Sequence, residues 1–153
     1  MPQTTTQELA RESIDAFNRS DWQATRDLSS PQYVYEETGT GRRCEGIDEA
    51  VAALQEWKAA LPDGTGEVTR IVGEGDLVVL EIIWRGTQTG DLRTPTGTLP
   101  ASGKAFQTWA TLWQRWENGK LVEARHHLDI LSLLGQLGQL GAFPAPAAAT
   151  GRS

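Results

Sequence analysis

An Asn-Gly pair at residues 118 and 119 joins two stretches in which apolar and polar residues alternate. Asn-Gly supplies the two left-handed backbone positions that a tight two-residue β-turn needs. Alternation with a period of two is typical of a strand with one buried face, and it covers residues 105–117 and 120–130. The pair therefore predicts a long antiparallel hairpin, which restricts the chain to folds that contain an antiparallel sheet.

The turn also predicts which residues share a face of this hairpin. Without an extra residue in either strand, Glu117 faces Lys120 and Thr108 faces Asp129. One face then carries Thr108, Ala110, Leu112, Gln114, Arg125, His127 and Asp129, and the other carries Trp109, Trp113, Val122, Ala124, His126 and Leu128. Because buried charges are costly unless they are paired or used, the charged groups on the first face indicate a cavity beside it.

A β-bulge would change this prediction. Bulges are common in curved sheets, and one extra residue turns the side chains beyond it to the opposite face. In that alternative Trp109 and Trp113 line the cavity and Asp129 does not.

Helices are expected before the sheet. Thr5 and Glu8 form a capping box at the start of the first helix, Asp21 can cap a second helix over residues 22–28, and a third begins after Gly46 and stops before Pro62. The remaining strands are expected at residues 33–36, 68–72 and 77–87, with a polar loop at 88–104 whose role as a lid is left open. We predict a single domain over residues 1–141 and a disordered tail over residues 142–153.

Composition excludes several classes of function. The net charge of −6 and the scattered basic residues argue against a nucleic-acid partner. No apolar run approaches the ~20 residues of a membrane-spanning helix, and the N-terminus lacks the order of a signal peptide. A single cysteine, Cys44, excludes an internal disulfide. We therefore expect a soluble cytoplasmic protein.

Several short motifs follow one another in an order that resembles a known family. They are Phe17-Asn18 with Asp21-Trp22, residues 46–50 (GIDEA), 57–63 (WKAALPD), 86–90 (GTQTG), 118–123 (NGKLVE), and Asp129 followed by 136–138 (QLG). Over roughly residues 5–140 the chain resembles the SnoaL-like polyketide cyclases, a branch of the nuclear-transport-factor-two-like superfamily. The chain differs from the usual Gly-Thr-His-x-Gly motif of that family, because Gln88 occupies the position of the histidine.

The resemblance implies an α+β fold in which a cone-shaped, curved antiparallel sheet packs on three N-terminal helices and encloses an apolar cavity. It also implies a homodimer and no metal or organic cofactor. In the cyclase members an aspartate matching Asp129 acts as acid and base in an intramolecular aldol closure, and an arginine matches Arg125.

The candidate catalytic residues are Asp129, His127 and Arg125. A weakly solvated carboxylate at Asp129 suits a general base, His127 could share the proton transfer, and Arg125 could stabilise an enolate oxygen. The structural alternative is a simple ion pair of Asp129 with Arg125 or His127. Candidate substrate-binding residues are Tyr35, Trp57, Trp84, Thr108 and Leu112, and no metal site is expected because His126 and His127 point to opposite faces.

These features predict a cofactor-independent cyclase, isomerase or lyase acting on a hydrophobic, carbonyl-bearing small molecule of the polyketide or ester type. An epoxide-hydrolase-like enzyme and a non-catalytic ligand-binding domain are the alternatives, since fold alone does not decide function. The exposed tryptophans, Trp109 and Trp113, predict a homodimer built on that sheet face.

Overall fold

The computed structural model describes residues 5–141 of the protein. The tail predicted for residues 142–153 lies outside this range. Within it, the chain forms the predicted α+β fold with a curved sheet, which has six strands, and a separate two-stranded hairpin is also present.

The three expected N-terminal helices are present. They are α1 (Thr6–Asn18), α2 (Trp22–Leu28) and α3 (Ile47–Ala60). Thr5 and Glu8 form the predicted capping box, in which each side chain accepts a hydrogen bond from the other residue's backbone N–H. The carboxylate of Asp21 caps α2 by accepting from the Ala24 N–H.

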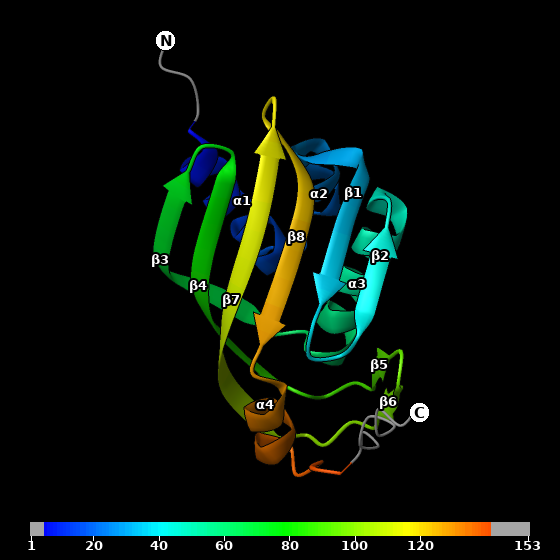
Figure 1. Ribbon diagram of the computed structural model, residues 1–153. Helices are drawn as coiled ribbons and strands as arrows, with labels where there is room; N and C mark the ends of the chain where they lie inside the picture. The colour runs from blue at the N-terminus through cyan, green and yellow to red at the C-terminus, as the bar shows by residue number, and fades with distance from the viewer. Residues whose placement is uncertain (1–4, 142–153) are drawn as a thin grey trace, which may run out of the picture.

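The six strands of the main sheet lie in the order β2-β1-β8-β7-β4-β3 (Figure 1). Their bounds are β1 (Ser29–Glu37), β2 (Arg42–Glu45), β3 (Thr65–Glu74), β4 (Leu77–Thr87), β7 (Ala105–Glu117) and β8 (Lys120–Leu128). Neighbouring strands run antiparallel except for β1 and β8, which pair in parallel. The last strand of the chain therefore lies in the middle of the sheet, beside the first.

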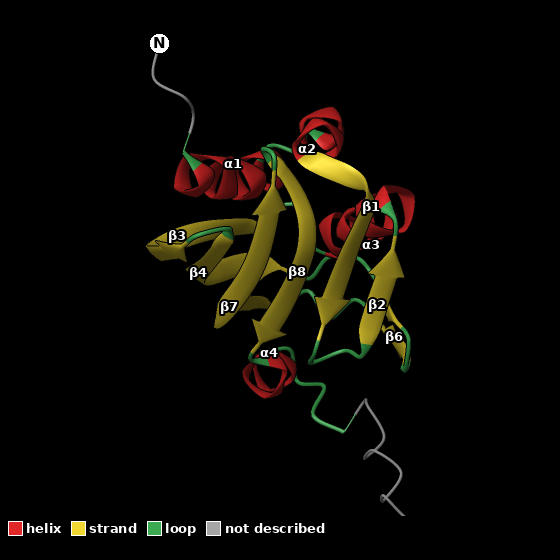
Figure 2. Ribbon diagram, turned by 45° about the horizontal axis from the view of Figure 1, so that its top comes forward, coloured by secondary structure: helices red, strands yellow, loops and turns green. Residues whose placement is uncertain are grey.

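Helices α1, α2 and α3 cover one face of the sheet and leave the other face bare (Figures 1 and 2). Burial alternates along β7, where Phe106, Thr108, Ala110, Leu112, Gln114 and Trp116 point toward the helices. Trp109 and Trp113 point the other way and are 51% and 45% exposed. The prediction for the two faces of β7 is therefore confirmed.

The predicted pairing of β8 with β7 is wrong beyond the first residues of β8. Trp116 faces Leu121 as expected, but Arg115 faces Glu123, so Val122 is an extra residue that has no partner on β7. This bulge shifts the rest of β8 by one position, so that Leu112 faces His126 and Trp113 faces Arg125. Every side chain of β8 after Val122 consequently lies on the face opposite to the predicted one.

Three elements are not anticipated by the sequence pattern. Strand β2 pairs with the end of β1, and the stretch expected to be an irregular loop contains a small hairpin, β5 (Leu92–Thr94) and β6 (Gly97–Leu99). Leu92 and Leu99 anchor this hairpin in the core. The third element, α4 (Ile130–Gln136), directly follows β8 and packs on β7 at the lower end of the sheet in Figure 1.

Candidate active site

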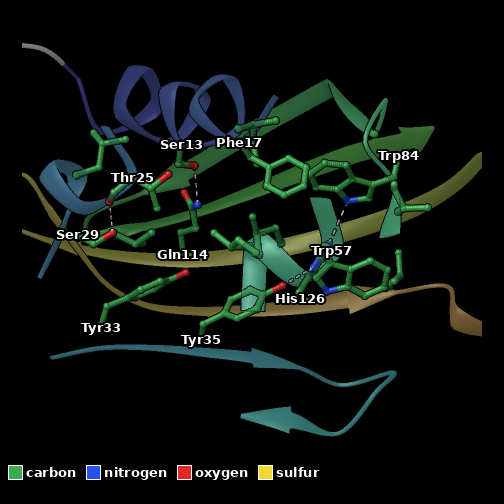
Figure 3. A pocket seen from close by; sticks show the side chains of 18 of the residues that line it. Ser13, Phe17, Thr25, Ser29, Tyr33, Tyr35, Trp57, Trp84, Gln114 and His126 are labelled. Carbon is green, nitrogen blue, oxygen red and sulfur yellow. Dashed lines mark hydrogen bonds between the residues drawn. The ribbon is translucent and has the colours of Figure 1, made fainter. Parts of the chain in front are cut away.

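A cavity lies between the covered face of the sheet and the helices (Figure 3). Its wall is mostly apolar and includes Ile14, Phe17, Leu28, Leu54, Leu61, Phe106, Leu112, Leu121, Leu128 and Leu133. The centres of water molecules could occupy about 100 Å³ of it. At ~10–15 Å³ for each water, this space holds roughly seven to ten water molecules, which is the volume of a small organic ligand.

One polar side chain from each of three strands meets in this cavity. The indole N–H of Trp84 on β4 lies 3.2 Å from Nε2 of His126 on β8, and Nδ1 of His126 lies 3.1 Å from the hydroxyl oxygen of Tyr35 on β1. His126 is only 8% exposed. Figure 3 shows the three side chains in a row along the cavity wall.

A buried carboxylate, that of Glu37, continues the row behind Tyr35. It is 2% exposed and accepts hydrogen bonds from the Tyr35 hydroxyl at 2.8 Å and the Trp57 indole at 2.6 Å. The Thr40 hydroxyl and the Arg42 guanidinium donate to its other oxygen, at 2.6 and 3.1 Å. Four donors, one of them cationic, compensate the charge of Glu37 and fix its position.

The partners of His126 determine which of its nitrogens carries the proton. An indole N–H can only donate, so Nε2 accepts from Trp84. The single hydrogen of the Tyr35 hydroxyl is donated to Glu37, so its oxygen accepts from Nδ1–H of His126. His126 is therefore a neutral imidazole with its proton on Nδ1, and its basic nitrogen is Nε2.

Burial keeps His126 neutral. Desolvation lowers its pKa to about 4, while the negative charge of Glu37 acts in the opposite direction and His127 adds a small further lowering. At neutral pH the imidazole is therefore able to accept a proton. Its conjugate acid is a strong donor that readily returns the proton.

A glycine holds Trp84 in place. Gly66 on β3 faces Trp84 across the sheet, and a Cβ at residue 66 would lie 2.7 Å from a ring carbon of the indole. On another side the ring of Phe17 packs edge-on against the indole, with centroids 5.3 Å apart. The indole N–H is thus aimed at His126 by packing on both sides.

Four of the residues predicted to bind substrate line the cavity. They are Tyr35, Trp57, Trp84 and Leu112, and their role in binding stays a prediction. Thr108 is fully buried, but it does not line the cavity and instead donates a hydrogen bond to the backbone carbonyl of Asp129.

The three predicted catalytic residues lie outside the cavity, so the prediction that they face it is wrong. The Val122 bulge turns Arg125 and His127 to the exposed face, where Arg125 pairs with Glu36 and His127 contacts the Thr38 hydroxyl. Asp129 lies beyond the end of β8, is exposed, and caps α4 by accepting from the Ser132 N–H. Neither an Asp129–Arg125 pair nor an Asp129–His127 pair is present.

Sequence reasoning missed His126 and Glu37. The bulge left no recognisable mark in the sequence, so His126 was expected on the wrong face. Glu37 did carry a signal, because Tyr33, Tyr35 and Glu37 alternate along β1 and share one face. Asp129 carried one too, since an aspartate before the apolar run of residues 130–134 is typical of a helix N-cap.

Comparison with known proteins identifies the family. The family model described as SnoaL-like polyketide cyclase matches residues 7–137 of the chain. This protein belongs to the SnoaL-like family. No curated protein matches the chain in sequence.

Solved structures of SnoaL-like and related proteins share the fold. IdmH from Streptomyces antibioticus, described as a candidate polyketide cyclase, is 27% identical, with a TM-score of 0.74 over 88% of this chain and 99% of its own. AclR from Streptomyces galilaeus, described as a candidate hydroxylase, is 26% identical, with a TM-score of 0.72 over 88% and 96%. A candidate SnoaL-like polyketide cyclase from Jannaschia sp. CCS1 shares the fold at 20% identity and a TM-score of 0.78 over 95% and 98%.

The family model and the similarity to IdmH support an enzymatic role of the cyclase type for this SnoaL-like chain. Residues 5–141 contain no group of three His, Cys, Asp or Glu side chains placed to hold a metal ion. In the same residues no helix is long and apolar enough to cross a membrane.

Proposed function

We propose that this SnoaL-like protein catalyses a cyclisation or isomerisation of a hydrophobic, carbonyl-bearing small molecule, without a cofactor, and that His126 is its acid–base residue. The observation that carries the proposal is the position of His126, a neutral imidazole on the wall of an apolar cavity with its lone pair on Nε2. At neutral pH it is the side chain on that wall that is uncharged and can accept a proton.

The reaction begins with transfer of a proton from carbon to Nε2 of His126. The carbon is one that lies next to a carbonyl group, and its deprotonation leaves an enolate. Nε2 has one lone pair, so Trp84 must release it as the substrate binds, before the proton is transferred, and the freed indole N–H then donates to the carbonyl oxygen that becomes the enolate oxygen. In a cyclisation the enolate carbon attacks a second carbonyl of the same molecule, and the new alkoxide takes the proton back from Nε2–H.

Tyr35 and Glu37 stabilise the protonated state of His126. The imidazolium keeps its Nδ1–H bond to Tyr35, and Tyr35 keeps its bond to the Glu37 carboxylate, which places a negative charge at the end of the row. Glu37 does not line the cavity and acts through Tyr35. It is therefore a positioning residue.

The low pKa of His126 limits the type of substrate. A weak base removes a proton efficiently only from an acidic carbon, because proton transfer is fastest when donor and acceptor have similar pKa values. Carbons between two carbonyl groups meet this requirement, and poly-β-carbonyl chains contain many of them. We therefore propose a substrate of the polyketide type.

An epoxide-hydrolase-like reaction has less support, because it needs a carboxylate in the cavity to activate water. No Asp or Glu among residues 5–141 lines this cavity.

Exchange of carbon-bound hydrogen for deuterium tests the proposal. 2-Tetralone is a bicyclic ketone whose C1 hydrogens are acidified by both the carbonyl group and the adjacent aromatic ring. It is incubated with the protein in D₂O, and loss of the C1 hydrogen signals is followed by NMR. Wild type should accelerate exchange, and His126→Phe should reduce this acceleration by about 10²-fold or more. His127→Phe is the matched control and should stay within about twofold of wild type.

Two results would contradict the proposal. Equal acceleration by His126→Phe and wild type would remove His126 from the reaction. Binding of the ketone to wild type without any acceleration would favour a non-catalytic ligand-binding domain.

We further propose that two copies of the chain associate through the bare face of the sheet. Trp109, Trp113 and Leu77 are each more than 40% exposed there. The face also carries both signs of charge, from Arg115, Arg125 and Glu123. A surface with both signs around an apolar centre can complement itself about a twofold axis. Sedimentation equilibrium should show a dimer for wild type and a monomer for Trp109→Gln/Trp113→Gln; a monomeric wild type would contradict this proposal.

A further inference from the structure

Tyr33 is the polar side chain on the cavity wall that has no hydrogen-bond partner within residues 5–141. Every other polar group on the wall is satisfied inside the protein. Ser13 and Gln114 bond to each other, Ser29 donates to the Thr25 carbonyl, and Thr25 donates to that of Asp21. Tyr35 and Trp57 donate to the Glu37 carboxylate, and Trp84 donates to His126. Arg85 donates to Glu67 and Gln107.

The hydroxyl of Tyr33 is also withdrawn from solvent. Its side chain is 5% exposed, and burial raises its pKa above the ordinary value, so it remains a protonated phenol. A buried hydroxyl without a partner is uncommon, because it loses its hydrogen bonds to water and gains none in the protein. In a binding cavity, such a group is available to the ligand.

The place of Tyr33 relates it to the acid–base site. Tyr33 and Tyr35 are two residues apart on β1, both point inward, and their ring centroids lie 6.4 Å apart. In Figure 3 Tyr33 lies at the end of the cavity near Ser29, with Trp84 at the other end, and its hydroxyl points inward as that of Tyr35 does. Two residues along a strand span about 7 Å, so the Tyr33 hydroxyl is a hydrogen-bonding point distinct from the Tyr35 hydroxyl that bonds to His126.

The type of ligand oxygen follows from the surroundings of Tyr33. A neutral phenol in an apolar setting donates to a carbonyl, ester or hydroxyl oxygen. A carboxylate or phosphate would need a cation, and Arg85, the basic residue on the wall, is already paired with Glu67. The wall is otherwise lined by apolar side chains, which favours a largely hydrophobic ligand.

We infer that the cavity binds a hydrophobic substrate that carries a second, neutral oxygen at a distance from its reacting carbon, and that Tyr33 donates a hydrogen bond to this oxygen. The inference rests on the proposed function for the identity of the reacting end. It adds a second recognition point.

A pair of ligands that differ by one oxygen tests the inference. 2-Tetralone and 6-hydroxy-2-tetralone have the same bicyclic skeleton, and the extra hydroxyl lies at the end opposite to the ketone. Dissociation constants are measured by quenching of tryptophan fluorescence, since Trp57 and Trp84 line the cavity. Wild type should bind the hydroxy compound about tenfold more tightly, and Tyr33→Phe should abolish the difference while leaving the affinity for 2-tetralone unchanged.

Ser29→Ala is the matched control, because it removes a hydroxyl from the same end that is already bonded to Thr25. It should keep the tenfold difference. Thermal unfolding supplies a second measurement: Tyr33→Phe should melt at the wild-type temperature or above it, since it removes an unpaired hydroxyl. A lower melting temperature would show that the hydroxyl is paired within the protein and would overturn the inference.

The outcomes separate this inference from the proposed function. Persistence of the tenfold difference in Tyr33→Phe, or failure of wild type to bind either ketone, overturns the Tyr33 subsite. If the Tyr33 subsite is overturned but His126→Phe exchanges deuterium more slowly than wild type, the acid–base proposal stands without the subsite. If exchange never occurs but the difference depends on Tyr33, the subsite stands and the cavity binds without catalysis.

Discussion

His126 and His127 are adjacent in the chain and lie in opposite environments. His126 faces the cavity, is 8% exposed, and is bonded through both ring nitrogens. His127 lies on the bare face of the sheet and is exposed, and within residues 5–141 its side chain bonds only to the Thr38 hydroxyl. The contrast shows that residue type and spacing do not identify a catalytic group; the face of the strand on which it lies does.

A single extra residue assigns the two histidines to their faces. The hairpin turn fixes the pairing at Leu121, and Val122 then shifts everything after it by one position. If Val122 were paired with Arg115 instead of bulging, His127 and Arg125 would face the cavity, and His126 would face solvent. The site therefore depends on a residue that does not touch it.

The largest effect is expected from shifting β8 by one residue beyond the bulge. Insertion of an alanine between Ala124 and Arg125 would turn two charged or titratable side chains, Arg125 and His127, toward the core, and it should cost more than about 4 kcal/mol of unfolding free energy. Urea denaturation followed by circular dichroism measures this loss. Deletion of Val122 is the control: it removes the bulge but leaves His126 opposite Leu112, so it should cost at most about 2 kcal/mol. An insertion variant as stable as wild type would show that the register of β8 does not set the two faces.

The pH dependence of stability sharpens the comparison of the two histidines. The pKa of His126 is about 4 in the folded state and about 6.5 when the chain is unfolded, so the unfolded chain binds the extra proton between these values. The contribution of His126 is complete above about pH 6.5 and is lost as the pH falls toward 4. The total loss is on the order of 3 kcal/mol.

Unfolding free energies at a series of pH values between 7.5 and 4.5 measure this contribution. His126→Phe should flatten the dependence, and His127→Gln should retain the wild-type slope. An unchanged slope in His126→Phe would mean that another group titrates in this range.

Asp129 provides a smaller test at the end of the same strand. Asp129→Ala removes the N-cap of α4 and should cost about 1 kcal/mol, while Asp129→Asn keeps a capping oxygen and should cost only a few tenths. Both variants should exchange 2-tetralone hydrogens at the wild-type rate, as measured by NMR in D₂O. A large loss of exchange in Asp129→Asn would return the acid–base role to the carboxylate.

The smallest effect is expected for Arg125 on the bare face. Its pairing with Glu36 is half exposed, so Arg125→Gln should change the unfolding free energy by less than about 1 kcal/mol. The change should shrink further in 0.5 M salt, because salt screens exposed pairs. A loss of several kcal/mol at both salt concentrations would mean that Arg125 packs against structure.

The elements that could be predicted from the sequence are those with a long periodic pattern or a strong boundary signal. Long alternating or helical stretches and strong punctuation such as Asn118-Gly119 or Pro62 predicted β4, β7 and α1 to α3 well, because local periodicity determines them. Strand β2 and the β5-β6 hairpin are only three or four residues long, which is too short for a period to be recognised. Their stability comes from contacts made elsewhere, as with the buried Leu92 and Leu99.

The site was predicted in part, for a related reason. Tyr35, Trp57, Trp84 and Leu112 were expected at the cavity and do line it, because large apolar or aromatic side chains on regular elements point inward. His126 was missed because the shift at Val122 arises from sheet curvature and from pairing with β1, and neither is encoded in a local pattern.

The position of β8 between β1 and β7 has a consequence for synthesis of the protein on the ribosome. Until β8 emerges, the N-terminal pair β2-β1 and the later group β7-β4-β3 each have an unpaired inner edge, and the two groups have no hydrogen bonds to each other through the sheet. The hydrogen bond between Tyr35 and the His126 imidazole can form only after His126, 91 positions later in the chain, has been synthesised. The nascent chain is thus exposed to sheet-edge association for nearly the whole of its translation, and premature termination before residue 120 would release a product with two open edges and no acid–base group.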